Sequence, residues 1–224
     1  MRSLSFALPA LLLAATPARP CALALLFALD VSASVDATEY RLQRDGLAAA
    51  LVSPAVSQAI LAQPGGVALA AYEWSGRYQQ EVMLPWTRVT DLASLTQAAR
   101  QLAAASRSYA EFPTAIGYAL GYGSAIMAEA PACDRRVIDI SGDGVGNEGF
   151  PPAAAYREFA FAGITVNGLV IGADDPALLE YYLTHIPHGP DAFVEIAADF
   201  RSYEEAMKRK LLRELGGLNL AVAE

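Results

Sequence analysis

The chain has 224 residues, enough for one sizeable hydrophobic core and too few for two comfortable ones. With 54% apolar and 18% charged residues it is globular, which excludes a disordered protein. The formal net charge is −8, and the only lysines, Lys208 and Lys210, lie near the end of the chain. Without a basic patch, nucleic acid is a poor partner, and none is expected.

The first twenty residues have the layout of a secretory signal peptide. Arg2 precedes an apolar run over residues 4–15, and small residues and Arg19-Pro20 follow that run. The run is too short to span a bilayer, so a membrane anchor is the less favoured alternative and the mature chain, residues 21–224, has no expected membrane span. We therefore expect an exported protein, periplasmic or secreted, whose net charge becomes −10 when Arg2 and Arg19 are removed.

Apolar runs and helical stripes alternate along the mature chain. An almost uninterrupted apolar run over residues 22–29 predicts a strand that is buried on both faces of a parallel sheet. Further strands are predicted over residues 67–74, 78–84, 136–141, 165–171 and 192–196. Helices are predicted over residues 37–51, 91–105, 114–127, 152–162, 176–186 and 201–215. This alternation indicates one α/β domain with a mostly parallel sheet.

Oxygen-bearing residues follow three of these segments where a ligand would bind. In an open α/β sheet, ligands bind beyond the carboxyl ends of the strands. Asp30, Ser32 and Ser34 follow the first strand, Thr114 opens a helix after a loop, and Asp143 follows the strand over residues 136–141. Taken singly, such residues are more often helix caps or turn residues. Taken together, they predict a site for a hard divalent cation, which prefers oxygen ligands.

The order and spacing of these residues resemble the metal-ion-dependent adhesion site (MIDAS) of the von Willebrand factor type A domain. The resemblance is carried by the segments VSASVDATEYRLQRDGLAAAL (31–51), TAIG (114–117), RVIDISGDG (136–144) and GPDAFVE (189–195). These segments look like a bacterial family of exported von Willebrand A proteins classed as a domain of unknown function. The resemblance implies a six-stranded sheet with the order 3-2-1-4-5-6, in which strand 3 is antiparallel, flanked by helices.

The resemblance also implies a role for each residue of the site. Ser32, Ser34 and Thr114 would contact Mg²⁺ or Mn²⁺ directly, whereas Asp30 and Asp143 would act wholly or partly through water. Neutral hydroxyl ligands leave the cation strongly electrophilic, so it would accept an Asp or Glu carboxylate from a protein partner. The expected function is therefore cation-dependent protein binding, not catalysis.

Three residues near Thr114 could modify this site. Glu111 could fill the remaining ligand position and close the site. Tyr109 and Phe112 are either plain core residues or part of a rim that contacts the partner.

Cys21 and Cys133 each precede an apolar run that is predicted to be a strand. Both would therefore lie at the same edge of a parallel sheet, and exported proteins with an even cysteine count usually oxidise them. A disulfide is reasonable if the two strands are neighbours, and two buried free thiols are the alternative. The strand order that the resemblance implies makes these strands neighbours and supports the disulfide.

Two other hypotheses remain. The segment GDGVGNE (142–148) resembles a motif of haloacid-dehalogenase phosphatases, with Asp30 as the nucleophile and Asp143 as a Mg²⁺ ligand. Two departures oppose this hypothesis: Ser32 stands where that family has its general acid, and no lysine is available to clamp the phosphate. The last hypothesis is a structural domain that is indifferent to metal.

Overall fold

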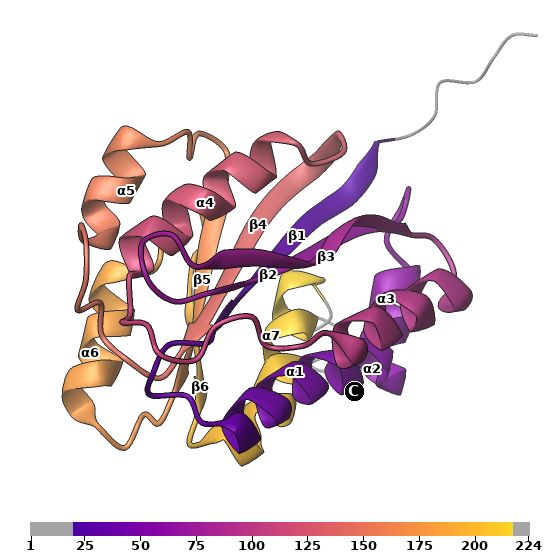
Figure 1. Ribbon diagram of the computed structural model, residues 1–224. Helices are drawn as coiled ribbons and strands as arrows, with labels where there is room; N and C mark the ends of the chain where they lie inside the picture. Colours follow the sequence, from indigo (N-terminus) through magenta and orange to yellow (C-terminus); the bar gives the residue numbers. More distant parts are fainter. Residues whose placement is uncertain (1–19, 217–224) are drawn as a thin grey trace, which may run out of the picture.

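The computed structural model describes residues 20–216, so the predicted signal peptide lies almost entirely outside the described residues. One sheet is formed by β1 (Cys21–Asp30), β2 (Val67–Trp74), β3 (Gln80–Val89), β4 (Cys133–Gly142), β5 (Thr165–Ile171) and β6 (Val194–Ala197). The strand order is β3-β2-β1-β4-β5-β6, and β3 is antiparallel to β2 while the other pairs are parallel (Figure 1). The predicted order and the antiparallel third strand are confirmed.

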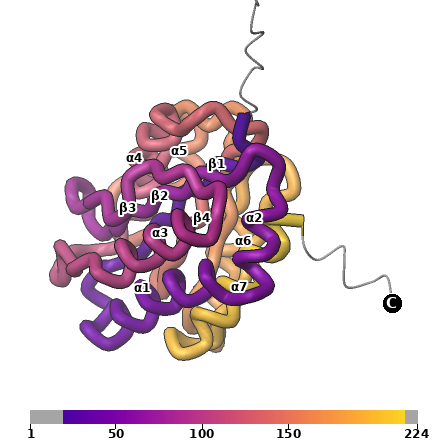
Figure 2. Tube along the Cα trace, turned by 90° about the vertical axis from the view of Figure 1, so that its right-hand side faces the viewer, coloured from indigo at the N-terminus to yellow at the C-terminus, as the bar shows by residue number. Residues whose placement is uncertain are grey.

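Helices cover both faces of the sheet. One face is covered by α1 (Ala37–Val52), α2 (Pro54–Leu61), α3 (Leu92–Ala104) and α7 (Tyr203–Glu214), and the other by α4 (Ile116–Ala128), α5 (Pro152–Glu158) and α6 (Pro176–His185) (Figure 1). A short 3₁₀ helix, η1 (Phe200–Ser202), precedes α7. The turned view in Figure 2 shows α1, α2 and α7 beside one another. In the described part of the chain, no helix is both long and apolar enough to cross a membrane.

The uninterrupted apolar run of β1 follows from its central position. Successive side chains of a strand point to opposite faces, so both faces of a doubly covered strand must be apolar. Leu25 and Phe27 belong to the core under α1, α3 and α7, whereas Ala24 and Leu26 belong to the core under α4, α5 and α6. The sheet separates the two cores, and β1 contributes side chains to both of them.

Some predicted boundaries were wrong. Strand β3 begins at Gln80 and continues to Val89, beyond the predicted end at residue 84. It includes Pro85, which an edge strand tolerates because its outer N–H groups need no partner strand. Helix α5 ends at Glu158, four residues early, and a turn with Gly163 at φ 70° then leads into β5. Thr114 does not open α4, because the first helical residue is Ile116.

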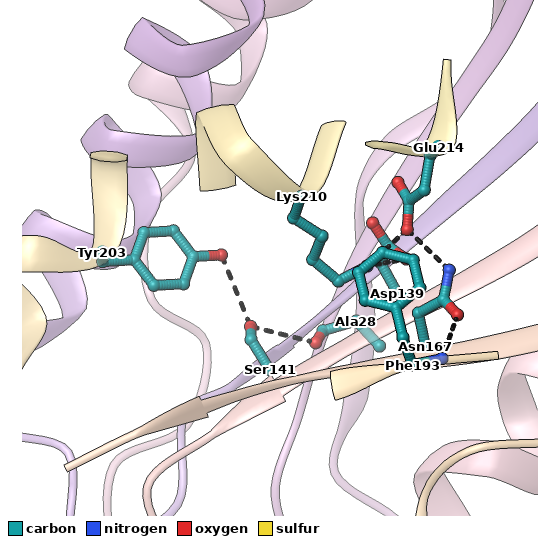
Figure 3. Close-up of polar contacts among 8 residues, drawn as sticks. All are labelled: Ala28, Asp139, Ser141, Asn167, Phe193, Tyr203, Lys210 and Glu214. Atoms are coloured by element: carbon teal, nitrogen blue, oxygen red, sulfur yellow. Dashed lines mark hydrogen bonds and ion pairs between the residues drawn. The ribbon is translucent and has the colours of Figure 1, made fainter. Parts of the chain in front are cut away.

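A buried ionic cluster attaches α7 to the centre of the sheet (Figure 3). Lys210 is fully buried and forms ion pairs with Asp139 of β4 and with Glu214, whose Oε1 lies 2.6 Å from Lys210 Nζ. The same oxygen accepts a hydrogen bond of 2.7 Å from Asn167 Nδ2 on β5. Burial raises the pKa of Asp139 well above its ordinary value, the Glu214 charge raises it further, and Lys210 opposes both effects. Buried charges need such partners because they lose their hydration.

Cys21 and Cys133 face one another in the β1–β4 register and form a disulfide, with their Cα atoms 4.4 Å apart. The predicted disulfide is confirmed, and the alternative of two free thiols is wrong. The bond joins the first residues of the two central strands, at the edge of the sheet opposite to the predicted metal site.

Reduction of this disulfide should destabilise the protein substantially. A cross-link over a sequence separation of 112 residues removes much of the entropy of the unfolded chain, about 4–5 kcal/mol in the chain-entropy account. Urea unfolding with and without dithiothreitol measures this difference. The Cys21→Ser, Cys133→Ser double variant is the control, since dithiothreitol should leave its midpoint unchanged. An unchanged midpoint for the wild type in dithiothreitol would contradict the prediction.

Candidate metal centre

The carboxyl ends of β1 and β4 lie side by side, because Leu29 pairs with Ser141 in the register of the two strands. Asp30, the last residue of β1, is fully buried. Its Oδ1 accepts a hydrogen bond of 2.7 Å from the backbone N–H of Ser32, which turns the chain sharply as it leaves the strand. This turn holds Ser32 over the end of the sheet.

Hydroxyl groups link the three loops of the predicted site. Ser32 Oγ lies 3.2 Å from Thr114 Oγ1 and 3.2 Å from Ser34 Oγ. Ser34 Oγ in turn donates a hydrogen bond of 2.7 Å to Asp143 Oδ1. The structure therefore brings together all five residues that the sequence singled out, Asp30 included.

Three further side chains hold these loops, and the sequence analysis missed them. Gln43 of α1 is fully buried, and its Nε2 donates to the Asp30 carbonyl at 2.8 Å. Arg107 Nη2 donates to the carbonyls of Val31 and Ser32, at 2.9 and 3.1 Å. Asn147 Oδ1 accepts the Thr114 N–H at 2.9 Å. These contacts join segments 13 to 76 residues apart, so no local sequence pattern reveals them.

The residues near Thr114 differ in their relation to the site. Among the described residues, Glu111 forms no hydrogen bond or ion pair with the five site residues, and its side chain is exposed. Phe112 is 38% exposed, and its carbonyl accepts the Ala33 N–H at 2.9 Å, so it lies beside the loop that follows β1. Tyr109 is half-buried, packs against the core and contacts the Phe112 ring edge to face at 5.8 Å.

The site brings two acidic side chains close together, one of them fully buried. Burial raises the pKa of Asp30 to about 7, and the nearby Asp143 charge adds to this effect, while hydrogen bonds from Ser32 and the charge of Arg107 oppose it. Burial also raises the pKa of Asp143, and the hydrogen bond from Ser34 opposes that shift. In the described structure, Asp30 Oδ2 is buried and has no hydrogen-bond partner. An unpaired buried carboxylate oxygen is costly, and a cation beside it would offset that cost.

The donor set fits a hard divalent cation. Three hydroxyl and two carboxylate groups offer only oxygen, the ligand type that Mg²⁺ and Mn²⁺ prefer. Gly142 lets the Asp30 side chain lie close to the backbone at the end of β4, since a Cβ at that position would lie 2.7 Å from Asp30 Oδ2. Over the described residues, no group of three or more His, Cys, Asp or Glu side chains offers a rival metal site.

Neither lysine of the chain serves this site. Lys210 lies in the buried ionic cluster of Figure 3, and Lys208 forms ion pairs with Glu204 and Glu205 of its own helix. The haloacid-dehalogenase hypothesis needs a lysine that clamps the phosphate. The fold brings neither lysine to the site, in agreement with the sequence.

The strand order, the antiparallel β3 and the loops at the carboxyl ends of β1 and β4 define a von Willebrand factor type A fold. The chain belongs to the family described as "Protein of unknown function (DUF1194)", which matches residues 20–219. No curated protein matches the sequence.

Solved structures share the fold at low sequence identity. A von Willebrand factor type A protein from Catenulispora acidiphila is 19% identical with a TM-score of 0.61, over 87% of this chain and 43% of that one. The von Willebrand factor domain of the type V pili tip protein Mfa5 from Porphyromonas gingivalis is 13% identical with a TM-score of 0.58, over 92% of this chain and 98% of that one. Proximal thread matrix protein 1 from the mussel byssus, with a zinc-occupied MIDAS motif, is 14% identical with a TM-score of 0.59, over 88% of this chain and 46% of that one. The chain spans about half the length of the mussel and Catenulispora proteins.

The raised pKa of Asp30 predicts a specific pH dependence of stability without metal. A carboxyl whose pKa is higher in the folded than in the unfolded protein stabilises the fold below its unfolded value of 3.8, and this contribution is lost as the pH rises through about 7. In EDTA, the stability of the wild type relative to Asp30→Asn should fall by roughly 2–3 kcal/mol between pH 5 and pH 8.

Urea unfolding of both proteins over this pH range provides the measurement, and the difference between them cancels groups that titrate in both. Parallel stability curves for the two proteins would show that Asp30 does not titrate in this way.

Proposed function

We propose that this protein is an exported module that binds a protein partner through a divalent cation. The observation that carries the proposal is the gathering of Asp30, Ser32, Ser34, Thr114 and Asp143 at the carboxyl ends of the two central strands. One buried oxygen of this group, Asp30 Oδ2, is left without a hydrogen-bond partner in the described structure.

The site residues differ in how deeply they are buried. Ser32 and Thr114 are buried, whereas Ser34 is exposed and Asp143 is half-buried, so the open side of the site is at Ser34 and Asp143. In the proposal, the three hydroxyl groups contact Mg²⁺ or Mn²⁺ directly and the two aspartates act wholly or partly through water. The bound cation supplies an electrophilic position for an Asp or Glu carboxylate of the partner.

The similar structures support this proposal. One has a zinc-occupied MIDAS motif, which supports a metal at the corresponding end of the sheet here. Another is a domain of a pili tip protein, a setting outside the cytoplasm that agrees with export. Phe112 and Glu111 lie exposed near the open side and are the first candidates for partner contacts.

Magnesium should stabilise the purified protein through the hydroxyl ligands. If the dissociation constant is about 1 mM, 10 mM Mg²⁺ adds about 1.4 kcal/mol, a rise of roughly 3–6 °C in Tm for a domain of this size. Thermal unfolding in EDTA and in Mg²⁺ measures the shift. The Ser32→Ala, Thr114→Ala double variant should lose it.

A matched control is the Ser57→Ala, Thr96→Ala double variant, which removes one serine and one threonine hydroxyl from α2 and α3. Those hydroxyls donate to the helix carbonyls of Pro54 and Leu92, outside the proposed site. The control should keep the full Mg²⁺ shift. Equal shifts in wild type and the Ser32, Thr114 variant would place the cation elsewhere, and no shift in the wild type would favour a domain indifferent to metal.

Residues 1–20 should direct export and then be removed. Fused to an alkaline phosphatase that lacks its own leader, they should give phosphatase activity in the bacterial periplasm, because this enzyme is active only where its disulfides form. Deletion of residues 4–15 from the fusion is the control and should abolish the activity. Mass spectrometry of the exported full chain should show a new amino terminus near Cys21. Activity that stays with an uncleaved, membrane-bound fusion would instead support an anchor.

A further inference from the structure

Tyr182 of α6 is buried beside the candidate metal centre with no visible partner for its hydroxyl. The side chain is fully buried, and its Oη has no hydrogen-bond partner among the described residues. Buried hydroxyl groups in native proteins are almost always hydrogen-bonded, to protein or to an ordered water. The Tyr182 hydroxyl is therefore a group whose partner has to be identified.

The surroundings of Gly142 point to that partner. A Cβ built at Gly142 would lie 2.6 Å from Tyr182 Oη and 2.7 Å from Asp30 Oδ2. These two buried oxygen atoms without partners thus lie near one another against the Gly142 backbone, an approach that a side chain at position 142 would prevent. Since each lies within 2.7 Å of that Cβ position, the two oxygen atoms are close enough for one water placed between them, clear of the Gly142 backbone, to reach both at normal hydrogen-bond lengths.

The chemistry of the two groups is complementary. An ionised carboxylate only accepts hydrogen bonds, whereas a phenol hydroxyl can donate one. Asp30 Oδ1 already accepts the Ser32 N–H at 2.7 Å, so a donor at Oδ2 would fix the carboxylate at both oxygens. Tyr182 itself is held in place by its position in α6 and by packing in the core under α4, α5 and α6.

We infer that Tyr182 is a positioning residue for the candidate metal centre: its hydroxyl orients Asp30 through one water that lies between the two side chains. The part of this inference that concerns metal rests on the proposed function. Residues that orient the ligands of a metal commonly contribute 10–100-fold to its affinity. Removal of the Tyr182 hydroxyl should therefore weaken cation binding without removing any ligand.

Calorimetric titration of the purified protein with Mg²⁺ tests this role. Tyr182→Phe should raise the dissociation constant about tenfold or more. The matched control is Tyr72→Phe, which also loses a fully buried hydroxyl; that hydroxyl donates to the Ala119 carbonyl at 2.7 Å, away from the site. The control should bind Mg²⁺ as the wild type does. Equal affinities for Tyr182→Phe and the wild type would overturn the positioning role.

A second measurement in EDTA tests the contact itself and does not depend on metal. The changes in Tm of Tyr182→Phe, Asp30→Asn and the double variant should be non-additive, because the two groups share one hydrogen-bonded water. Additive changes would overturn the inference. If the wild type binds no Mg²⁺ while the changes are non-additive, the proposed function fails and the link between Tyr182 and Asp30 stands.

Discussion

The parallel pairing of β1 with β4 is the constraint on which the rest of this structure depends. The register runs from Cys21 opposite Cys133 to Leu29 opposite Ser141. One end of this pair carries the disulfide, and the other places Asp30, the last residue of β1, beside the loop after β4 that carries Asp143. A slip by one residue would turn every side chain of a strand to the opposite face, and both features would be lost. Stability and the candidate site therefore depend on the same register.

Two groups of buried carboxylates differ in how their charge is balanced. Asp139 and Glu214 receive an internal cation, because Lys210 of α7 lies between them (Figure 3). Asp30 receives no such partner within the described residues: Arg107, the nearby cation, donates to the carbonyls of Val31 and Ser32. The first cluster satisfies its own charge and holds a helix in place. The second leaves negative charge and an unpaired oxygen at the end of the sheet, which is what a site for an external cation requires.

Much of the fold could be predicted because its signals are local. The strand over residues 67–74 was predicted to the residue, and the helix that begins at Ala37 within one residue of its end, since periodicity and the Asp36 cap are properties of neighbouring residues. The predicted ends of β3 and α5 were wrong. Pairing with β2 extends β3, and the turn before β5 ends α5 early, so in both places tertiary structure overrides local preference. The burial of Lys210 could not be predicted, since its partner Asp139 lies on β4, far away in the sequence, and the i,i+4 spacing to Glu214 is equally typical of an exposed helix face.

The sequence by itself determined the class of fold, the disulfide partners and the five oxygen-bearing residues. These depend on which residues end each strand and on a resemblance whose segments span the mature chain. Only the tertiary structure decided that Gln43, Arg107 and Asn147 hold the loops and that Tyr182 and Asp30 both lie against Gly142. The physical reason is that these contacts join distant segments through single side chains. Such contacts leave no periodicity in the chain and exist only once the sheet has brought its loops together.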